Sequence, residues 1–393
     1  MKTFFIIIFS SIAIFFAIFG IVTSQWYLTA IPIGFMFGFF LQKGDLCASS
    51  AMSEMIMFKD RSKIWGFWVA IVSTMISIAI IERLGLITLS PKPLFWLSYI
   101  IGGIIFGIGM VFAGGCISGV SYKGAAGNIN SIMALMAVPI GIAMVEYGPL
   151  SVFSENLKQY LVNGTNGESI SLSYITGIPF WILAIIFGIS TIAYSLWKHK
   201  KNKFTFSIPL KRSWKPWVAG LLIGILGALA YLSSAETGRN YPLGITHGVL
   251  FTKMLFTEKP DNLILVKSKP KIETQAVATQ ANVKVIKKPT ENKKKVSMWL
   301  VLVFTSLLFG SWVSAALSGQ AKLLPKDPSQ TLVALFGGLM IGVGAAMTGG
   351  CSIGNILSGW GLMSIGNFIF GIFVLLANWA TTYFYLMGGK IGK

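Results

Sequence analysis

The stretch Gly102–Gly127, GGIIFGIGMVFAGGCISGVSYKGAAG, sets the organisation of this chain, because its pattern returns later as Gly337–Asn355, GGLMIGVGAAMTGGCSIGN. When Cys116 is set over Cys351, an offset of 235 residues, eight glycines of the two stretches and their continuation to Gly359 coincide without a gap. Glycine makes up only 43 of 393 residues, so chance does not readily produce this match. We infer a duplicated unit, which many membrane transporters contain.

The glycine pairs that precede these two cysteines predict a break in each helix. The pairs are Gly114-Gly115 and Gly349-Gly350. Consecutive glycines disfavour a helix and free backbone N–H groups, and a half-helix that begins there presents a partial positive charge. Such a helix start is suited to an anion. Other matched glycines, such as Gly103 and Gly107, have the four-residue spacing that lets membrane helices pack closely.

The composition places the chain in a membrane. Hydrophobic residues make up 54%, charged residues only 11%, and the mean hydropathy is +0.73, whereas a soluble domain carries about 25% charged residues. A water-soluble enzyme is therefore excluded, and we predict an all-α polytopic membrane protein with about nine transmembrane helices. The predicted spans are Phe4–Val22, Ile64–Ile81, Leu94–Phe112, Ile129–Tyr147, Ile175–Leu196, Pro216–Leu232, Val296–Leu317, Leu332–Met347 and Ile365–Met387.

Three apolar segments need a separate interpretation. Phe4–Val22 is compatible with a signal peptide, but its length favours an uncleaved first helix. Pro32–Gln42 and Pro242–Phe256 are too short for full spans and are followed or preceded by glycine and polar residues. We predict that they form broken or re-entrant helices.

Basic residues cluster in two stretches outside the predicted spans. The net charge is +19; Lys198 to Lys215 holds seven basic residues and no acid, and Lys253 to Lys295 holds eleven lysines against four acids. Basic loops beside apolar spans are typical of the cytoplasmic side, so both stretches are predicted to be cytoplasmic. A nucleic-acid partner is not expected, because no folded basic domain is available to bind one. Attraction to the anionic lipid bilayer accounts for the lysines.

These features divide the chain into three parts. Residues 1–197 form a first repeat unit with an N-terminal helix, 198–215 a basic cytoplasmic loop, and 216–393 a second repeat unit interrupted by a Lys-rich flexible insertion at 258–296. The span count favours a parallel arrangement of the two units, although one misassigned short helix would reverse that answer.

The three cysteines are the candidates for chemistry. Cys47, Cys116 and Cys351 lie far apart and form no CxxC pair, so neither a disulfide framework nor a structural zinc site is expected. Each thiol alone could serve as a small buried hydrophobic group. Together, three thiols in glycine-rich breaks could line one path, because a thiol donates and accepts weak hydrogen bonds. Nearby cationic and polar residues favour an anion with polarisable sulfur over a metal ion; they are Lys43, Lys123, Arg239, Asn128 and Asn355.

Glu146 and His247 are two further candidates. An ionisable residue inside a membrane is a functional candidate, but Gly148-Pro149 marks the end of a span, so an interfacial position for Glu146 is an equal alternative. His247 follows Thr246 directly and could belong to the same path. No Ser/His/Asp set, phosphate loop or HExxH motif is present in the sequence. We therefore predict no cofactor, and an ATP-driven pump would need a separate ATPase.

Four segments together resemble the YeeE/YedE family of sulfur-compound transporters, in particular its thiosulfate-uptake branch. They are Gly34–Cys47 (GFMFGFFLQKGDLC), Gly102–Gly127, Ser234–Thr246 (SAETGRNYPLGIT) and Gly337–Asn355, in the family's order over most of the chain. The resemblance implies an hourglass-shaped helical protein of the bacterial plasma (inner) membrane, whose narrow centre passes thiosulfate along successive cysteine thiols. It also implies a small cytoplasmic TusA-like sulfur-carrier protein as a frequent partner.

The resemblance further implies which residues form the substrate pathway. By motif these are Cys47, Cys116, Cys351, Gly114, Gly115, Gly349, Gly350, Gly44, Thr246, Arg239, Lys123, Glu236 and Asn355. The chain departs from the family pattern at three positions. Asp45 stands where a basic residue is common, Lys123 where arginine is common, and Ala126 where an acid is frequent. These differences concern the access and selectivity of the anion more than the path.

The sequence and the resemblance together predict a membrane importer of thiosulfate and not an enzyme. One alternative is a transporter of another sulfur or selenium oxyanion. Another is a membrane thiol or sulfurtransferase enzyme, which would carry a persulfide or mixed disulfide on a reactive cysteine. A third is a structural membrane subunit whose partner performs the transport.

Overall fold

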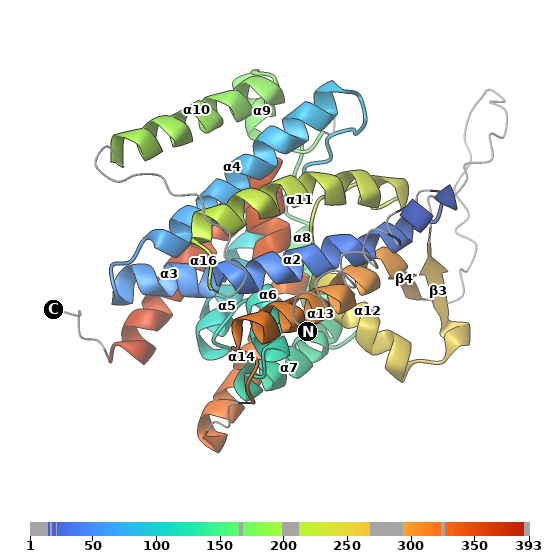
Figure 1. Ribbon diagram of the computed structural model, residues 1–393. Coiled ribbons are helices and arrows are strands. Elements are labelled where there is room, and N and C mark those ends of the chain that lie inside the picture. The colour runs from blue at the N-terminus through green and yellow to red at the C-terminus, as the bar shows by residue number, and fades with distance from the viewer. Residues whose placement is uncertain are drawn as a thin grey trace.

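The computed structural model describes residues 15, 18–20, 22–164, 168–198, 212–267, 294–323 and 327–388. Within these ranges eight helices are long and apolar enough to cross a membrane: Ser62–Arg83, Trp96–Ala125, Ile129–Glu146, Phe180–Trp197, Pro216–Glu236, Met298–Ser318, Pro328–Met347 and Ile365–Leu386. The predicted all-α polytopic membrane fold is confirmed (Figure 1). Most of the first predicted span (Phe4–Val22), most of the basic loop and residues 268–293 of the insertion lie outside the described residues.

Long helices alternate with short ones along the chain. The long helices are α2 (Ala30–Gly44), α4 (Ser62–Arg83), α5 (Trp96–Phe112), α7 (Ile129–Glu146), α10 (Phe180–Lys198), α11 (Pro216–Glu236), α13 (Met298–Ser318), α14 (Pro328–Met347) and α16 (Ile365–Thr381). A break and a shorter helix follow four of them: α3 (Ala48–Met57) after α2, α6 (Ile117–Ala125) after α5, α12 (Thr246–Thr257) after α11, and η3 (Ile353–Leu357) with α15 (Ser358–Gly361) after α14.

The other elements are short connections at the ends of the helices. They are η1 (Trp26–Thr29), β1 (Leu94–Phe95), α8 (Ser151–Lys158), β2 (Leu161–Val162), α9 (Leu172–Thr176), η2 (Pro260–Asn262), β3 (Leu263–Val266), β4 (Lys294–Ser297) and η4 (Thr382–Leu386). Strand β1 pairs antiparallel with β2, and β3 pairs parallel with β4. The second pair brings the two described edges of the Lys-rich insertion together.

Glycines let the long helices approach one another closely. A side chain at Gly38 of α2 would overlap the Leu307 carbonyl of α13, and one at Gly338 of α14 would overlap Ala134 of α7. At Gly107 of α5, an added Cβ would lie 2.7 Å from a carbonyl oxygen of α16. The close packing predicted from the four-residue glycine spacing is confirmed at these positions.

The two aligned stretches run in opposite directions. Gly102, near the start of α5, packs on Thr348 after the end of α14, whereas Gly109 packs on Ile341 and Gly337 packs on Ala113. Helices α5 and α14 are therefore antiparallel, and the parallel arrangement favoured by the span count is wrong. The predicted spans themselves agree with the antiparallel direction, because Leu332–Met347 is the fifth span after Leu94–Phe112 and an odd number of crossings reverses the direction. Helix α12 adds no crossing: it has 12 residues, about 18 Å of helix, whereas a crossing needs about 30 Å.

The helix directions also define two ends of the bundle. The Trp214 N–H donates to the Lys43 carbonyl at 2.8 Å, so α2 finishes where α11 begins; we call this the Lys43 end. Helix α11 packs parallel to α4, with Gly220 on Gly66 and Gly224 on Ser73. The loop after α11 therefore lies at the opposite end, which we call the Arg239 end.

The two basic stretches attach to opposite ends. Helix α13 runs parallel to α2, because Gly34 packs on Val303 while Lys43 Nζ lies 2.6 Å from Ser318 Oγ. The insertion precedes α13 and so attaches at the Arg239 end, whereas the 198–215 loop attaches at the Lys43 end. In Figure 1, β3 and β4 lie on the right and α3 on the left. The expectation that both stretches are cytoplasmic is therefore wrong.

Candidate functional site

Each of the four breaks ends at the start of a short helix. Cys47 is the residue before α3, Cys116 the residue before α6, and Thr246 is the first residue of α12. Cys351 lies two residues before η3. Two of the breaks depend on a left-handed glycine, with φ +67° at Gly114 and +65° at Gly349, a conformation that other residues adopt at a cost.

Cys47 and Cys116 form a thiol pair towards the Lys43 end. Both are fully buried, and both sulfurs lie against Gly119, with that of Cys116 3.7 Å from where a Cβ of this glycine would be. The Cys116 Sγ also lies 3.2 Å from Ser118 Oγ. Gly119 makes room for the pair, because a Cβ at this position would overlap the Cys47 sulfur. The structure thus brings together two cysteines that are 69 positions apart in the sequence.

Cys351 belongs to a separate cluster towards the Arg239 end. It is fully buried, and its main-chain N–H donates to Thr246 Oγ1 at 2.9 Å. Met110 lies between this cluster and the thiol pair: Ser352 Oγ contacts its sulfur at 3.9 Å, and Ser49 Oγ donates to its carbonyl at 3.0 Å. The Met110 side chain is itself fully buried, so the two clusters do not share an open channel in this structure.

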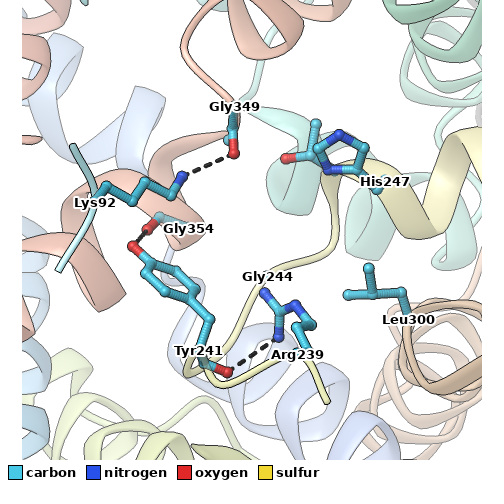
Figure 2. Close-up of a pocket in the computed structure, with 10 residues that line it drawn as sticks. Lys92, Arg239, Tyr241, Gly244, His247, Leu300, Gly349 and Gly354 are labelled. Atoms are coloured by element: carbon cyan, nitrogen blue, oxygen red, sulfur yellow. Dashed lines mark hydrogen bonds between the residues drawn. The ribbon is translucent and has the colours of Figure 1, made fainter. Parts of the chain in front are cut away.

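A cavity of about 300 Å³ opens beside Cys351 at the Arg239 end (Figure 2). Its lining consists of Lys92, Arg239, Tyr241, Gly244, Thr246, His247, Leu300, Gly349, Gly350 and Gly354. Two of these side chains are cationic, and none of these ten lining residues is an acid. Helix α12 also starts here, and no side chain caps its first turn. The cavity therefore offers hydrogen-bond donors and positive charge, as an anion site requires.

Lys92 crosses from the α4–α5 connection to the break after α14. Its Nζ donates to the Gly349 carbonyl and to Asn355 Oδ1, each at 2.7 Å, and lies 5.1 Å from the centre of the Tyr241 ring. Burial, with a smaller contribution from the charge of Arg239, lowers the pKa of Lys92 to about 7. Lys92 is not among the site residues predicted from the sequence. Its sole signal was a lone lysine between Pro91 and Pro93 before an apolar helix.

Arg239 shapes the loop that forms the cavity wall. Its Nη1 donates to the carbonyls of Pro242 at 2.6 Å and Tyr241 at 3.2 Å, and its guanidinium stacks 5.1 Å from the Trp299 ring. Burial lowers the pKa of Arg239 to about 10, so it stays cationic at neutral pH. Tyr241, also absent from the predicted site residues, donates its hydroxyl to the Gly354 carbonyl at 2.7 Å.

Lys123 holds the other Gly-Gly-Cys break in the same way. Its Nζ donates to the Gly114 carbonyl at 2.8 Å and lies 3.3 Å from Ser50 Oγ. In both Gly-Gly-Cys breaks the carbonyl of the left-handed glycine thus accepts a hydrogen bond from a lysine: Lys123 at Gly114 and Lys92 at Gly349. The two lysines come from unrelated positions of the duplicated units, so the sequence alignment does not reveal the likeness.

Acidic side chains gather near the thiol pair instead. Lys63 Nζ pairs with Asp45 Oδ2 at 2.5 Å and with Glu54 Oε1 at 2.6 Å. The Tyr122 hydroxyl donates to the other Asp45 oxygen at 2.7 Å. Lys63 supplies a cation beside Asp45, which occupies a position where the resemblance led us to expect a basic residue.

The remaining predicted site residues fall in different places. Asn355 is fully buried and donates to the Gly350 carbonyl at 2.8 Å, so it stabilises the Gly349-Gly350-Cys351 break. Gly44 lies against Ala219, where a side chain would clash, and is a packing position. Glu236 is exposed as the last residue of α11. His247 lines the cavity, and its Nε2 lies 2.8 Å from Glu146 Oε1, which joins the two ionisable candidates.

Comparison with known proteins identifies the family. A protein of Spirochaeta thermophila named thiosulfate transporter TsuA is 29% identical over 367 residues, which cover 90% of this chain and 98% of that protein. A protein of the same name from Escherichia coli is 26% identical over 367 residues, which cover 91% and 94%. A family model described as sulphur transport matches residues 43–380, which include all three cysteines and the four breaks. The chain therefore belongs to this sulphur-transport family, the YeeE/YedE family.

Proposed function

We propose that this chain imports thiosulfate across the bacterial plasma membrane. The observation that carries the proposal is the cavity at the Arg239 end, which has Lys92 and Arg239 in its lining, no acid among its ten lining residues, and Cys351 just beyond its floor. The two relatives described above are named thiosulfate transporters and align over nearly the whole chain. A transported anion is therefore a better fit than a cation or a neutral solute.

The cavity lowers the cost of removing the anion from water. A buried charge without partners is strongly disfavoured, and thiosulfate carries two negative charges. Lys92 and Arg239 supply positive charge, and the uncapped first turn of α12 supplies backbone N–H groups. These donors are fixed in place by hydrogen bonds to carbonyls, so little reorganisation is needed when the anion arrives.

From the cavity the anion would move along the thiols in the order Cys351, Cys116, Cys47. A thiol is a weak donor, so each contact holds the anion loosely enough for release, as conduction requires. All three thiols are fully buried, and Met110 lies between Cys351 and the pair. The structure is thus a closed state. Movement at the left-handed glycines, Gly114 and Gly349, is the simplest way to open it.

We assign the Lys43 end to the cytoplasm. Basic residues at this end are spread over several connections, namely the α3–α4, α10–α11 and α13–α14 loops. At the Arg239 end most of them belong to the one insertion, and charges spread over several short loops are the stronger topological signal. The cavity then faces outwards. A TusA-like sulfur carrier would receive the anion at the Lys43 end.

The test is growth of a thiosulfate-uptake-deficient bacterium on thiosulfate as the sole sulfur source. The wild-type chain should rescue growth, and Cys47→Ala, Cys116→Ala and Cys351→Ala should not, although each is inserted at normal levels. Ser314→Ala is the matched control, because Ser314 is equally buried but lies on α13 outside the breaks. Normal rescue by the Cys116→Ala variant would exclude transport along the thiols.

Two other outcomes would favour the alternative functions. Stronger competition by selenium oxyanions than by unlabelled thiosulfate would point to a selenium substrate. A persulfide or mixed disulfide on a cysteine, detected by mass spectrometry of trapped protein, would favour a sulfurtransferase. Activity in liposomes without a partner would exclude a purely structural role.

A further inference from the structure

The four breaks meet in two pairs, and only three of the four positions carry a thiol. At the Lys43 end Cys116 meets Cys47, the residue before α3: a Cβ at Gly119 would overlap the Cys47 sulfur and lie 3.7 Å from the Cys116 sulfur. At the Arg239 end the Cys351 N–H donates at 2.9 Å to Oγ1 of Thr246, the first residue of α12. Thr246 therefore takes the place that Cys47 takes in the other pair, with a hydroxyl instead of a thiol.

Thr246 is placed so that it can reach an anion in the cavity. It lines the cavity and is 3% exposed. Among the hydrogen bonds of the described residues Thr246 takes part in one, and there it is the acceptor. A hydroxyl has one donor hydrogen and two acceptor lone pairs, so this buried side chain still has its hydrogen to give. Cys351 does not line the cavity, so its thiol cannot contact an anion there.

The hydroxyl and the thiol differ in the atoms they suit. An O–H group is a strong donor that suits a charged oxygen, whereas an S–H group is a weak, polarisable donor. Thiosulfate has both kinds of acceptor: three sulfonate oxygens at one end and a terminal sulfur at the other. Lys92 and Arg239 share the cavity with Thr246 and also favour the sulfonate end.

We propose that Thr246 is a substrate-contacting residue that orients thiosulfate: its hydroxyl donates to a sulfonate oxygen, so that the terminal sulfur faces Cys351 and leads the anion into the thiol path. This assignment rests on the proposed function and adds the direction in which the anion enters. The three thiols then contact the terminal sulfur of thiosulfate, and the Thr246 hydroxyl contacts a sulfonate oxygen.

The deciding variant is Thr246→Cys. Its sulfur can still accept the Cys351 N–H that Thr246 Oγ1 accepts in the wild type, but the strong O–H donor is lost. In proteoliposomes we expect the KM for labelled thiosulfate to rise about tenfold, the value for one hydrogen bond to a charged group, while the maximal rate changes less than about threefold. Sulfate, which offers only oxygen atoms, should compete at a concentration that rises by the same factor.

Two further variants separate contact from architecture. Thr246→Ser retains the hydroxyl and should keep the KM within about threefold of wild type, whereas Thr246→Val loses both hydrogen-bonding roles and should be at least as impaired as Thr246→Cys. If Thr246→Val fails to fold, Thr246→Cys still decides the question.

The contrary results are distinct. A wild-type KM in Thr246→Cys would overturn the contact, and a thiosulfate-specific loss with unchanged sulfate competition would overturn the orientation. Absence of thiosulfate uptake by the wild-type chain would overturn the proposed function, and this inference with it.

Discussion

The two Gly-Gly-Cys breaks share a backbone design but lie in different electrostatic surroundings. At the Arg239 end, the break at Cys351 adjoins a cavity lined by Lys92 and Arg239 and by no acid among its ten lining residues. At the Lys43 end, the break at Cys116 adjoins Lys63, which pairs with two carboxylates. The first arrangement attracts a dianion, whereas in the second Lys63 and Lys123 are balanced by Asp45 and Glu54.

This difference shows how a duplicated scaffold can acquire two unlike ends. In both breaks a lysine holds the carbonyl of the left-handed glycine, so the local architecture is the same. The surrounding charges are not, and the partner of each cysteine differs, with a hydroxyl at one end and a thiol at the other. The cavity therefore captures the anion and the other end binds it less tightly, while the gradient of the anion sets the direction of net transport.

The sharpest way to break the comparison is to add a methyl group at the same position of each unit. Gly119→Ala would overlap the Cys47 sulfur, whereas the matching Gly354 has open space where the methyl group would go. We expect Gly119→Ala to destabilise the protein by about 1–3 kcal/mol through overpacking and to lower uptake by roughly tenfold or more, because it displaces the thiol. Gly354→Ala should cost less than about threefold.

Thermal unfolding in detergent and thiosulfate uptake would measure both effects. Equal losses in the two glycine variants would show that the thiol pair has no special need for space. A large loss in Gly354→Ala alone would place the narrowest point of the path at the cavity floor.

The second contrast replaces the two glycine-holding lysines. Lys92→Met removes positive charge from the cavity, so we expect the KM for thiosulfate to rise about ten- to hundredfold, the value of a hydrogen bond to a charged group. Lys123→Met, the matched variant at the Lys43 end, should change the KM less than about threefold, because Lys123 does not line the cavity. Initial rates at several thiosulfate concentrations measure both, and a larger KM change in Lys123→Met would reverse the proposed direction.

A third prediction concerns pH. Because the pKa of Lys92 lies at about 7, its amine is cationic below neutral pH and increasingly neutral above it. Anion binding favours the charged form, so the KM should be lowest below pH 7 and rise several-fold from about pH 6 to pH 8. Lys92→Arg stays charged over this range and should flatten the profile.

The other groups around Lys92 define the control for this experiment. Arg239 stays cationic, and burial raises the pKa of Tyr241, so neither titrates between pH 6 and 8. His247 also lines the cavity, paired with Glu146. His247→Gln should therefore keep the pH dependence that belongs to Lys92. An unchanged profile in Lys92→Arg would assign the dependence to another group.

How much of this could be predicted from the sequence depended on whether the signal was local. The breaks at Gly114 and Gly349 were local signals, because consecutive glycines interrupt an apolar run wherever they stand. Long apolar segments likewise predicted the spans, and their all-α character is confirmed. Gly44 shows the limit of this local signal. A glycine can mark either a helix break or a close helix contact, and Gly44 packs on Ala219.

What could not be predicted was set by contacts between distant segments. Lys92 reaches Gly349 and Asn355 from the other half of the chain, and nothing in Pro91-Lys92-Pro93 points to them. The parallel arrangement did not follow from the predicted spans themselves: Leu332–Met347 is the fifth span after Leu94–Phe112, and an odd number of crossings reverses the direction. The contacts of Lys92 depend on how distant elements are arranged in space, for which one sequence holds little information.

The smallest effect is expected from the acids at the Lys43 end. Asp45→Asn removes one partner of Lys63, but the pair is half exposed at Asp45 and Glu54 remains. The loss of stability should stay below about 1 kcal/mol. If negative charge speeds the departure of the anion, neutralising it should lower the maximal rate by about twofold and leave the KM at the distant cavity unchanged. Glu54→Gln should act in the same direction. A faster maximal rate in either variant would mean that these acids slow the anion. The Lys43 end would then be a barrier to the anion and not a site that speeds its release.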